Sequence, residues 1–167
     1  MSASLPLLPY HIYWINLDRR PDRREHMNIV LKNNVDNNTR ISAIDFHNNF
    51  APYNVVQHPR LSGGEHGCMC SHIKAMCEFI ASEHEYCFIC EDDVQDSYSQ
   101  YWKEYHIELL TKKFEILQLQ TTSNCYTNKL LLPINKSGSG TGFYKIKRSV
   151  AKSIVDDFYS ETDDVVT

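Results

Sequence analysis

This chain lacks a long apolar run, an excess of positive charge and an internal repeat. No apolar run approaches the roughly 20 residues that a membrane-spanning helix needs, so no membrane span is predicted. The net charge of −4 argues against a nucleic-acid partner, because nucleic-acid-binding proteins normally carry a basic face. A length of 167 residues without repeats or linkers indicates a single domain over residues 1–167.

A secretory signal is also missing from the first residues. The proline-broken stretch 4–9 is short and has no basic leader. Six cysteines without such a signal indicate free thiols in a reducing compartment, so we expect a cytoplasmic protein.

The cysteine spacing predicts structural thiols more readily than a metal site. Cys87 and Cys90 fall on an expected strand, where residues three apart face opposite sides and could not share one ion. Zinc binding through Cys68, Cys70 and His72 is an alternative, but this spacing matches no common zinc module. Free cysteine usually behaves as a small buried hydrophobe, and that interpretation is favoured.

Strand and helix patterns alternate along the chain. Pro21 suits the first turn of a helix, and Ser62 with Glu65 forms a capping-box pattern. The alternation predicts an α/β domain in which helices cover both faces of a mostly parallel sheet. The expected strands are 11–17, 39–44, 86–90, 114–120 and 143–146, and the expected helices are 21–32, 62–80, 97–110 and 149–159.

Three consecutive carboxylates, Glu91, Asp92 and Asp93, follow the apolar strand pattern at 86–90. Isolated buried charges are too costly to keep, so these residues are expected to emerge at the edge of the sheet. Ligands bind at that edge in open α/β sheets, and carboxylate oxygens suit a hard cation such as Mg²⁺ or Mn²⁺. The alternative is a solvated acidic turn.

A basic cluster follows the first expected strand and opens the first expected helix. A strand-to-helix turn offers free backbone N–H groups to an anion, and arginine adds forked donors that match phosphate. The alternative is that these arginines only pair with Asp18, Asp22 and Glu25. Phosphate-binding and cation-binding turns at one sheet edge are the combination that a nucleotide-sugar site needs. The cluster consists of Arg19, Arg20, Arg23 and Arg24.

Several segments resemble the motifs of glycosyltransferase family 25. This family includes bacterial lipooligosaccharide galactosyltransferases and collagen hydroxylysine galactosyltransferases. The matching segments occur in the family's order and span residues 12 to 164. They are INLDRRPDR at 15–23, GEHGCMCSH at 64–72, FICEDDV at 88–94, GTGFYKI at 140–146 and the acidic pair Asp163 and Asp164.

The resemblance implies a Rossmann-like GT-A fold, a UDP-sugar donor, with UDP-galactose expected, and Mn²⁺ or Mg²⁺ as cofactor. It implies a glycan or protein hydroxyl group as acceptor. Asp93 is the first choice of metal ligand and Glu91 the second, and Asp92 belongs to the same motif. The residues implied near the nucleotide are Asn16, Leu17, Arg19, Arg23 and Asp45.

The remaining implied positions are candidates for proton transfer or for supporting the site. An inverting transfer needs a carboxylate that accepts the acceptor's hydroxyl proton, and Asp163 and Asp164 are the candidates. A solvated acidic tail is the alternative for that pair. The resemblance also gives Glu65 and His72 a functional or supporting role, although a capping-box glutamate is structural and a helical histidine can be a packed, hydrogen-bonded residue.

The chain departs from the family pattern in two places. Phe46 follows Asp45 where the family commonly has glycine, and no histidine follows His106 to serve as a late metal ligand. Two other functions therefore stay open beside a hexosyltransferase. One is a UDP-sugar-binding pseudoenzyme with weak or no transfer, and the other is a metal-dependent phosphohydrolase that uses the same acidic triplet.

Overall fold

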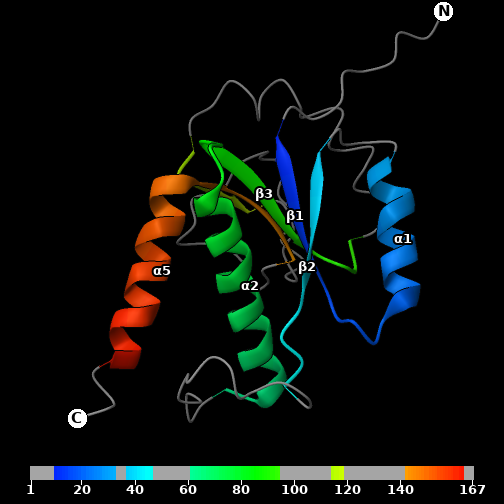
Figure 1. Ribbon diagram of the computed structural model, residues 1–167, viewed down its shortest axis with the longest axis horizontal. Helices are drawn as coiled ribbons and strands as arrows, with labels where there is room; N and C mark the ends of the chain where they lie inside the picture. Colours follow the sequence, from blue (N-terminus) through cyan, green and yellow to red (C-terminus); the bar gives the residue numbers. More distant parts are fainter. Residues whose placement is uncertain (1–9, 33–36, 47–60, 95–113, 119–141, 164–167) are drawn as a thin grey trace, which may run out of the picture.

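A mixed sheet of five strands forms the centre of the computed structural model (Figure 1). The structure describes residues 10–32, 37–46, 61–94, 114–118 and 142–163. The strands lie side by side in the order β2-β1-β3-β5-β4. Their bounds are β1 His11–Asn16, β2 Asn38–Ser42, β3 Tyr86–Glu91, β4 Ile116–Gln118 and β5 Phe143–Lys147.

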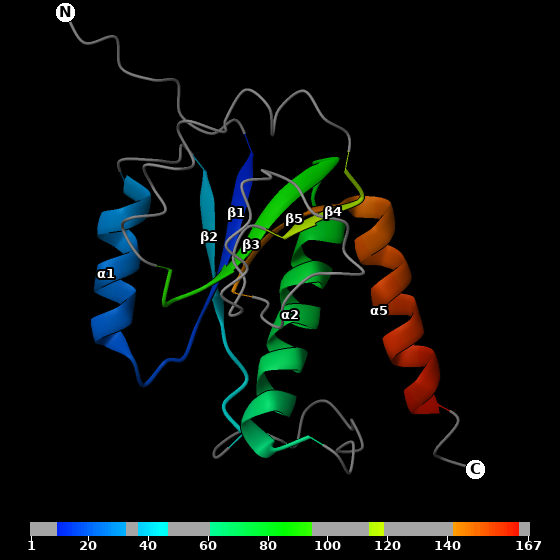
Figure 2. The ribbon, with the colours of Figure 1, turned by 180° about the vertical axis from the view of Figure 1, so that it is seen from behind.

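Within the described residues, three helices cover the two faces of this sheet, as the alternating pattern predicted. Helix α1, Pro21–Lys32, lies on one face, and helices α2, Gly63–Ala81, and α5, Arg148–Asp163, lie on the other. Figures 1 and 2 show this division from opposite sides. None of the described helices combines the length and the apolar character that crossing a membrane requires.

Each face of the sheet packs its own apolar cluster. On the α1 side, Met27 and Leu31 pack against strand residues that include Trp14 and Phe88. On the other side, Phe79 of α2 and Val155 of α5 pack with a second set of strand residues. Burial of these side chains supplies the main driving force for the layered arrangement.

Cys87 and Cys90 confirm the alternation expected of β3. Cys87 belongs to the cluster beneath α2 and α5, and Cys90 to the cluster beneath α1. Both are fully buried free cysteines. Burial raises the pKa of each thiol far above its ordinary value, so both remain protonated packing residues.

The direction of β5 corrects the expectation of a mostly parallel sheet. β1 pairs in parallel with β2 and β3, but β5 pairs antiparallel with β3 and with β4. Strand direction depends on how the chain returns to the sheet, and the connections before β4 and β5 contain no pattern that fixes it. The helix expected at 97–110 lies outside the described residues, and the single-domain division stays a prediction.

The parallel strands bring three chain segments to one edge. Ile15 of β1 is level with Ile41 of β2 and with Glu91 of β3. The residues that follow these strands therefore emerge together, next to the start of α2.

The α2 N-terminus has the predicted capping box, in which the Ser62 hydroxyl accepts from the Glu65 N–H and the Glu65 carboxylate accepts from the Ser62 N–H.

Candidate functional site

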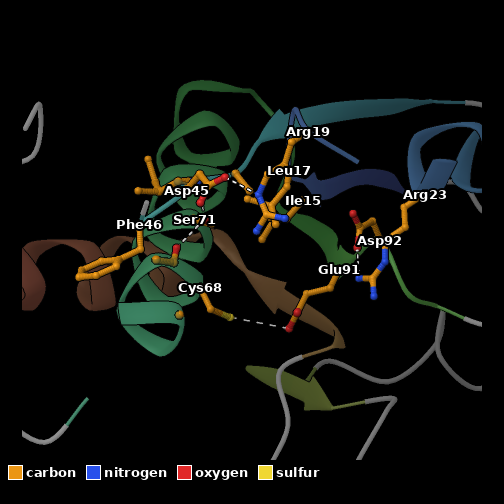
Figure 3. Close-up of a pocket in the computed structure, with 14 residues that line it drawn as sticks. Ile15, Leu17, Arg19, Arg23, Asp45, Phe46, Cys68, Ser71, Glu91 and Asp92 are labelled. Atoms are coloured by element: carbon orange, nitrogen blue, oxygen red, sulfur yellow. Dashed lines mark hydrogen bonds and ion pairs between the residues drawn. The ribbon is translucent and has the colours of Figure 1, made fainter. Parts of the chain in front are cut away.

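A cavity of about 200 Å³ opens where β1, β2 and β3 end and α2 begins. Six residues predicted for the nucleotide-sugar site line it together with Phe46, Gly67, Cys68 and Ser71, which were not predicted as part of that site (Figure 3). These six come from separate stretches of the chain, so the fold collects them. They are Leu17, Arg19, Arg23, Asp45, Glu91 and Asp92.

Asp92 links the end of β3 to the end of β1 and to the first turns of α1. Its Oδ2 accepts a hydrogen bond from the Asn16 amide at 2.7 Å, and its Oδ1 accepts one from the Arg23 guanidinium at 2.7 Å. Asn16 is completely buried, and Asp92 is 6% exposed. Because both carboxylate oxygens are engaged, Asp92 is suited to fix the site's shape and to place Arg23 beside the cavity.

Arg19 and Asp45 face each other across the cavity mouth. The Arg19 Nε donates to Asp45 Oδ2 at 2.6 Å, and the Arg19 side chain is 55% exposed. An exposed ion pair of this kind contributes little stability, so its partners are available to a ligand at small cost. The two residues were predicted near the nucleotide on the resemblance alone, and the structure brings them together.

The other two arginines of the basic cluster lie near acidic residues instead of the cavity, as the alternative interpretation predicted. Arg20 pairs with Asp22 at 2.7 Å on the surface, and Arg24 lies 3.8 Å from Asp18. Neither lines the cavity. The cluster therefore divides into a surface pair and a pair, Arg19 and Arg23, that reaches the site.

Glu91 and Asp93 have the donor atoms that a hard cation requires. Partial burial, and next the negative charge of Glu91, raise the pKa of the Asp93 carboxyl above its ordinary value, while Arg23 acts in the opposite direction. Carboxylate oxygens are the ligands that Mn²⁺ or Mg²⁺ prefers, but Asp93 does not line the cavity, so the metal motif stays a prediction. The side chain of Asp93 is 53% exposed, which leaves it accessible to an ion.

His72 and Glu65 do not line the cavity. His72 is buried behind it, where Nδ1 lies 3.0 Å from the Tyr144 hydroxyl and Nε2 lies 3.5 Å from Glu91 Oε1. The Glu65 carboxylate accepts from both the N–H and the hydroxyl of Ser62, and these bonds lower its pKa. Glu65 thus has the structural role that a capping box gives it.

The candidate proton acceptors fall where the structure gives no side-chain geometry. Asp163 is the last residue of α5, and its side chain lies outside the described part of the molecule. Asp164 lies outside the described residues altogether. Their catalytic role stays a prediction.

Gly67 and Ser71 hold α2 against the cavity, and both lie in the family-like segment 64–72 but were not among the predicted site residues. The Ser71 hydroxyl donates to the Gly67 carbonyl at 2.6 Å and accepts from the Ile44 N–H at 2.8 Å. A side chain at Gly67 would bring its Cβ within 2.8 Å of the Ile44 carbonyl oxygen. Glycine and serine four residues apart share a helix face, which was the available signal.

Phe46 also shapes the cavity and accounts for one departure from the family pattern. Its ring packs where the side chain of Gly63 would otherwise stand, since a Cβ built there would lie 2.2 Å from the ring. The glycine at 63 therefore makes room for the aromatic ring at 46, and the ring closes one side of the cavity.

Two glycines at the start of α2 give a matched test of this packing. Gly67→Ala is expected to lower the free energy of unfolding by about 1–3 kcal/mol, because the new methyl group meets backbone that cannot yield freely. Gly64→Ala has open space and is expected to raise it by about 0.5–1 kcal/mol, because alanine favours the helix. Urea denaturation of both variants measures the difference. Equal changes in the free energy of unfolding would show that α2 does not pack closely against the Ile44 backbone at Gly67.

These observations define an α/β protein with a cavity at the edge where its parallel strands end. Comparison with protein families then gives the particular class. The sequence model of glycosyltransferase family 25, described as LPS biosynthesis protein, matches residues 10–166. The chain belongs to glycosyltransferase family 25. No curated protein matches it.

Proposed function

We propose that this chain is a metal-dependent glycosyltransferase that transfers a hexose, with galactose expected, from a UDP-sugar to a hydroxyl group of a glycan or of a hydroxylysine-type protein acceptor. Family membership supports a transferase. The observation that carries the finer proposal is the cavity, which is lined both by arginines that can donate to phosphate and by carboxylates that can bind a cation. Arg19 pairs with Asp45 at this cavity, and Arg23 pairs with Asp92, next to Glu91.

The nucleotide would bind to residues that are already in ion pairs, and these pairs cost little free energy to disturb. Arg19 and Asp45 form an exposed pair that a nucleotide would separate or bridge. Buried Asp92 holds the Arg23 guanidinium, and the Arg23 side chain is still 38% exposed, so Arg23 is pre-positioned for a phosphate oxygen. Pre-positioning lowers the entropy that binding would otherwise cost.

The cation side would use Glu91 and Asp93. A bound Mn²⁺ or Mg²⁺ would supply Lewis-acid stabilisation of the charge that develops on a departing nucleoside diphosphate. Asn16 and Asp92 act through other residues in this proposal, because both are buried and hydrogen-bonded to each other. Asp163 or Asp164 would accept the proton of the acceptor hydroxyl.

Product identity tests the proposed transfer. The purified chain, UDP-galactose and Mn²⁺ would be incubated with a panel of simple glycosides and a hydroxylysine peptide, and the products weighed by mass spectrometry. We expect one acceptor to gain one hexose in a reaction that EDTA stops. UDP-glucose in place of UDP-galactose tests the sugar.

Each contrary outcome supports a different alternative. Release of UDP at the same rate with and without every acceptor, and with no hexosylated product, would indicate hydrolysis. Donor binding without turnover across the panel would indicate a UDP-sugar-binding pseudoenzyme. Either result would contradict the proposed transfer.

A further inference from the structure

Three side chains from α2 and β3 converge at the wall of the cavity. Cys68 and His72 are four residues apart on α2, so they share one face of the helix. Glu91 ends β3 and points toward them, as Figure 3 shows for Cys68. One ligand atom from each residue lies within 4.8 Å of the others.

The ring of His72 is oriented for a ligand at Nε2. His72 is 6% exposed, and its Nδ1 lies 3.0 Å from the Tyr144 hydroxyl. With Nδ1 as donor to that hydroxyl, Nε2 keeps its lone pair. Nε2 is buried and has no hydrogen-bond partner among the described residues. A metal-binding histidine typically donates its second ring N–H in this way.

Two of the separations lie near those of a tetrahedral site. Zinc bonds of about 2.0–2.3 Å at tetrahedral angles place ligand atoms about 3.3–3.6 Å apart. His72 Nε2 lies 3.5 Å from Glu91 Oε1, and the Cys68 thiol lies 3.9 Å from the same oxygen. The three ligand atoms all lie within 4.8 Å of one another, so the Cys68 thiol would have to move inward to complete the arrangement.

We propose that Cys68, His72 and Glu91 bind a zinc ion. Thiolate and imidazole select a borderline metal such as Zn²⁺ over Mg²⁺ and Mn²⁺, which prefer oxygen ligands. On binding, the Cys68 thiol gives its proton to solvent and the sulfur becomes a ligand. Because Cys68 and Glu91 line the cavity, the ion lies at the cavity wall, where a fourth ligand can reach it. Three protein ligands with one open position are typical of catalytic zinc sites.

This site differs from the sequence alternative and from the proposed donor site. The sequence alternative grouped Cys70 with Cys68 and His72, but Cys70 is not in the cluster, and Glu91 takes its place. The proposal shares Glu91 with the proposed Mn²⁺ site but needs neither Asp93 nor a UDP-sugar. Its success or failure is therefore measurable without turnover.

Cobalt substitution gives the test a direct readout of the sulfur ligand. The metal-free wild type would be titrated with Co²⁺, which replaces Zn²⁺ in such sites and has a thiolate-to-metal absorption band in the near ultraviolet. We expect one Co²⁺ per chain with that band, and its loss when Zn²⁺ is added. Cys68→Ser should abolish the band and weaken Zn²⁺ binding by at least about 10- to 100-fold.

Cys77→Ser is the matched control, because Cys77 lies on the same helix outside the cluster. Cys77→Ser and Asp93→Asn should both keep the cobalt band. His72→Gln should weaken Zn²⁺ binding. Thermal melts of the metal-free variants confirm that each is folded. The proposal is overturned if wild-type and Cys68→Ser proteins bind Zn²⁺ equally, or if the cobalt band survives in Cys68→Ser.

Failure of the donor proposal looks different from failure of the zinc proposal. A wild type that shows the Cys68-dependent cobalt band but binds no UDP would keep the zinc site and reject the donor site. A wild type that binds UDP with Mn²⁺ but shows no such band would do the reverse.

Discussion

Asp92→Ala is expected to lower the free energy of unfolding by about 3 kcal/mol. The substitution leaves the completely buried Asn16 amide without the acceptor that it has at 2.7 Å. It also removes the nearer carboxylate partner of the Arg23 guanidinium, which keeps only Asp93 at 3.8 Å. Breaking one side of a buried charged pair typically costs about 3–5 kcal/mol, and the partial exposure of Arg23 places this case at the lower end.

Urea denaturation measures this effect, and Asp156→Ala is its control. Asp156 forms a surface ion pair with Lys152 at 2.8 Å, one helical turn away. Loss of such an exposed pair changes stability by at most about 0.5 kcal/mol. If Asp92→Ala and Asp156→Ala unfolded at the same urea concentration, the Asn16–Asp92–Arg23 network would not hold the site together.

Asp93→Asn is expected to weaken Mn²⁺-dependent UDP binding by at least about 10- to 100-fold. Removing a residue that only hydrogen-bonds to a metal ligand already costs this much affinity, and Asp93 is proposed as a ligand itself. The amide keeps the shape of the side chain but removes the charge that would bind the cation. The side chain is 53% exposed, so folding should be unaffected. Calorimetric titration of UDP into each protein with saturating Mn²⁺ measures the change.

The control for Asp93→Asn is Asp22→Asn, which removes a carboxylate from the same end of the molecule. Asp22 pairs with Arg20 on the surface and does not line the cavity. We expect it to bind UDP like the wild type. Equal weakening by both substitutions would mean that general charge, and not a ligand at Asp93, governs binding.

The central layout of the site was predictable because parallel strands deliver their ends to one edge. The sequence placed a basic turn after the first strand and an acidic triplet after the strand at 86–90. The pairing of β1 with β3 brings these turns together, so Arg23 of one turn contacts Asp92 of the other. Local pattern and strand pairing were sufficient for this step.

Side-chain partners within the site were not predictable in the same way. Asp92 belongs to the acidic motif, yet its two oxygens hold Asn16 and Arg23. The contact of Cys68 with Glu91 depends on how α2 packs on β3, which no local pattern encodes. The reversed direction of β5 likewise follows from chain connections that carry no periodic signal.

The measurement that tests the central claim most directly is calorimetric titration of UDP and UDP-galactose into the wild-type protein, first with Mn²⁺ and then with EDTA. The account predicts binding at one site per chain that EDTA abolishes. Folded protein that binds neither ligand, with or without metal, would contradict the proposed donor site and favour the phosphohydrolase alternative.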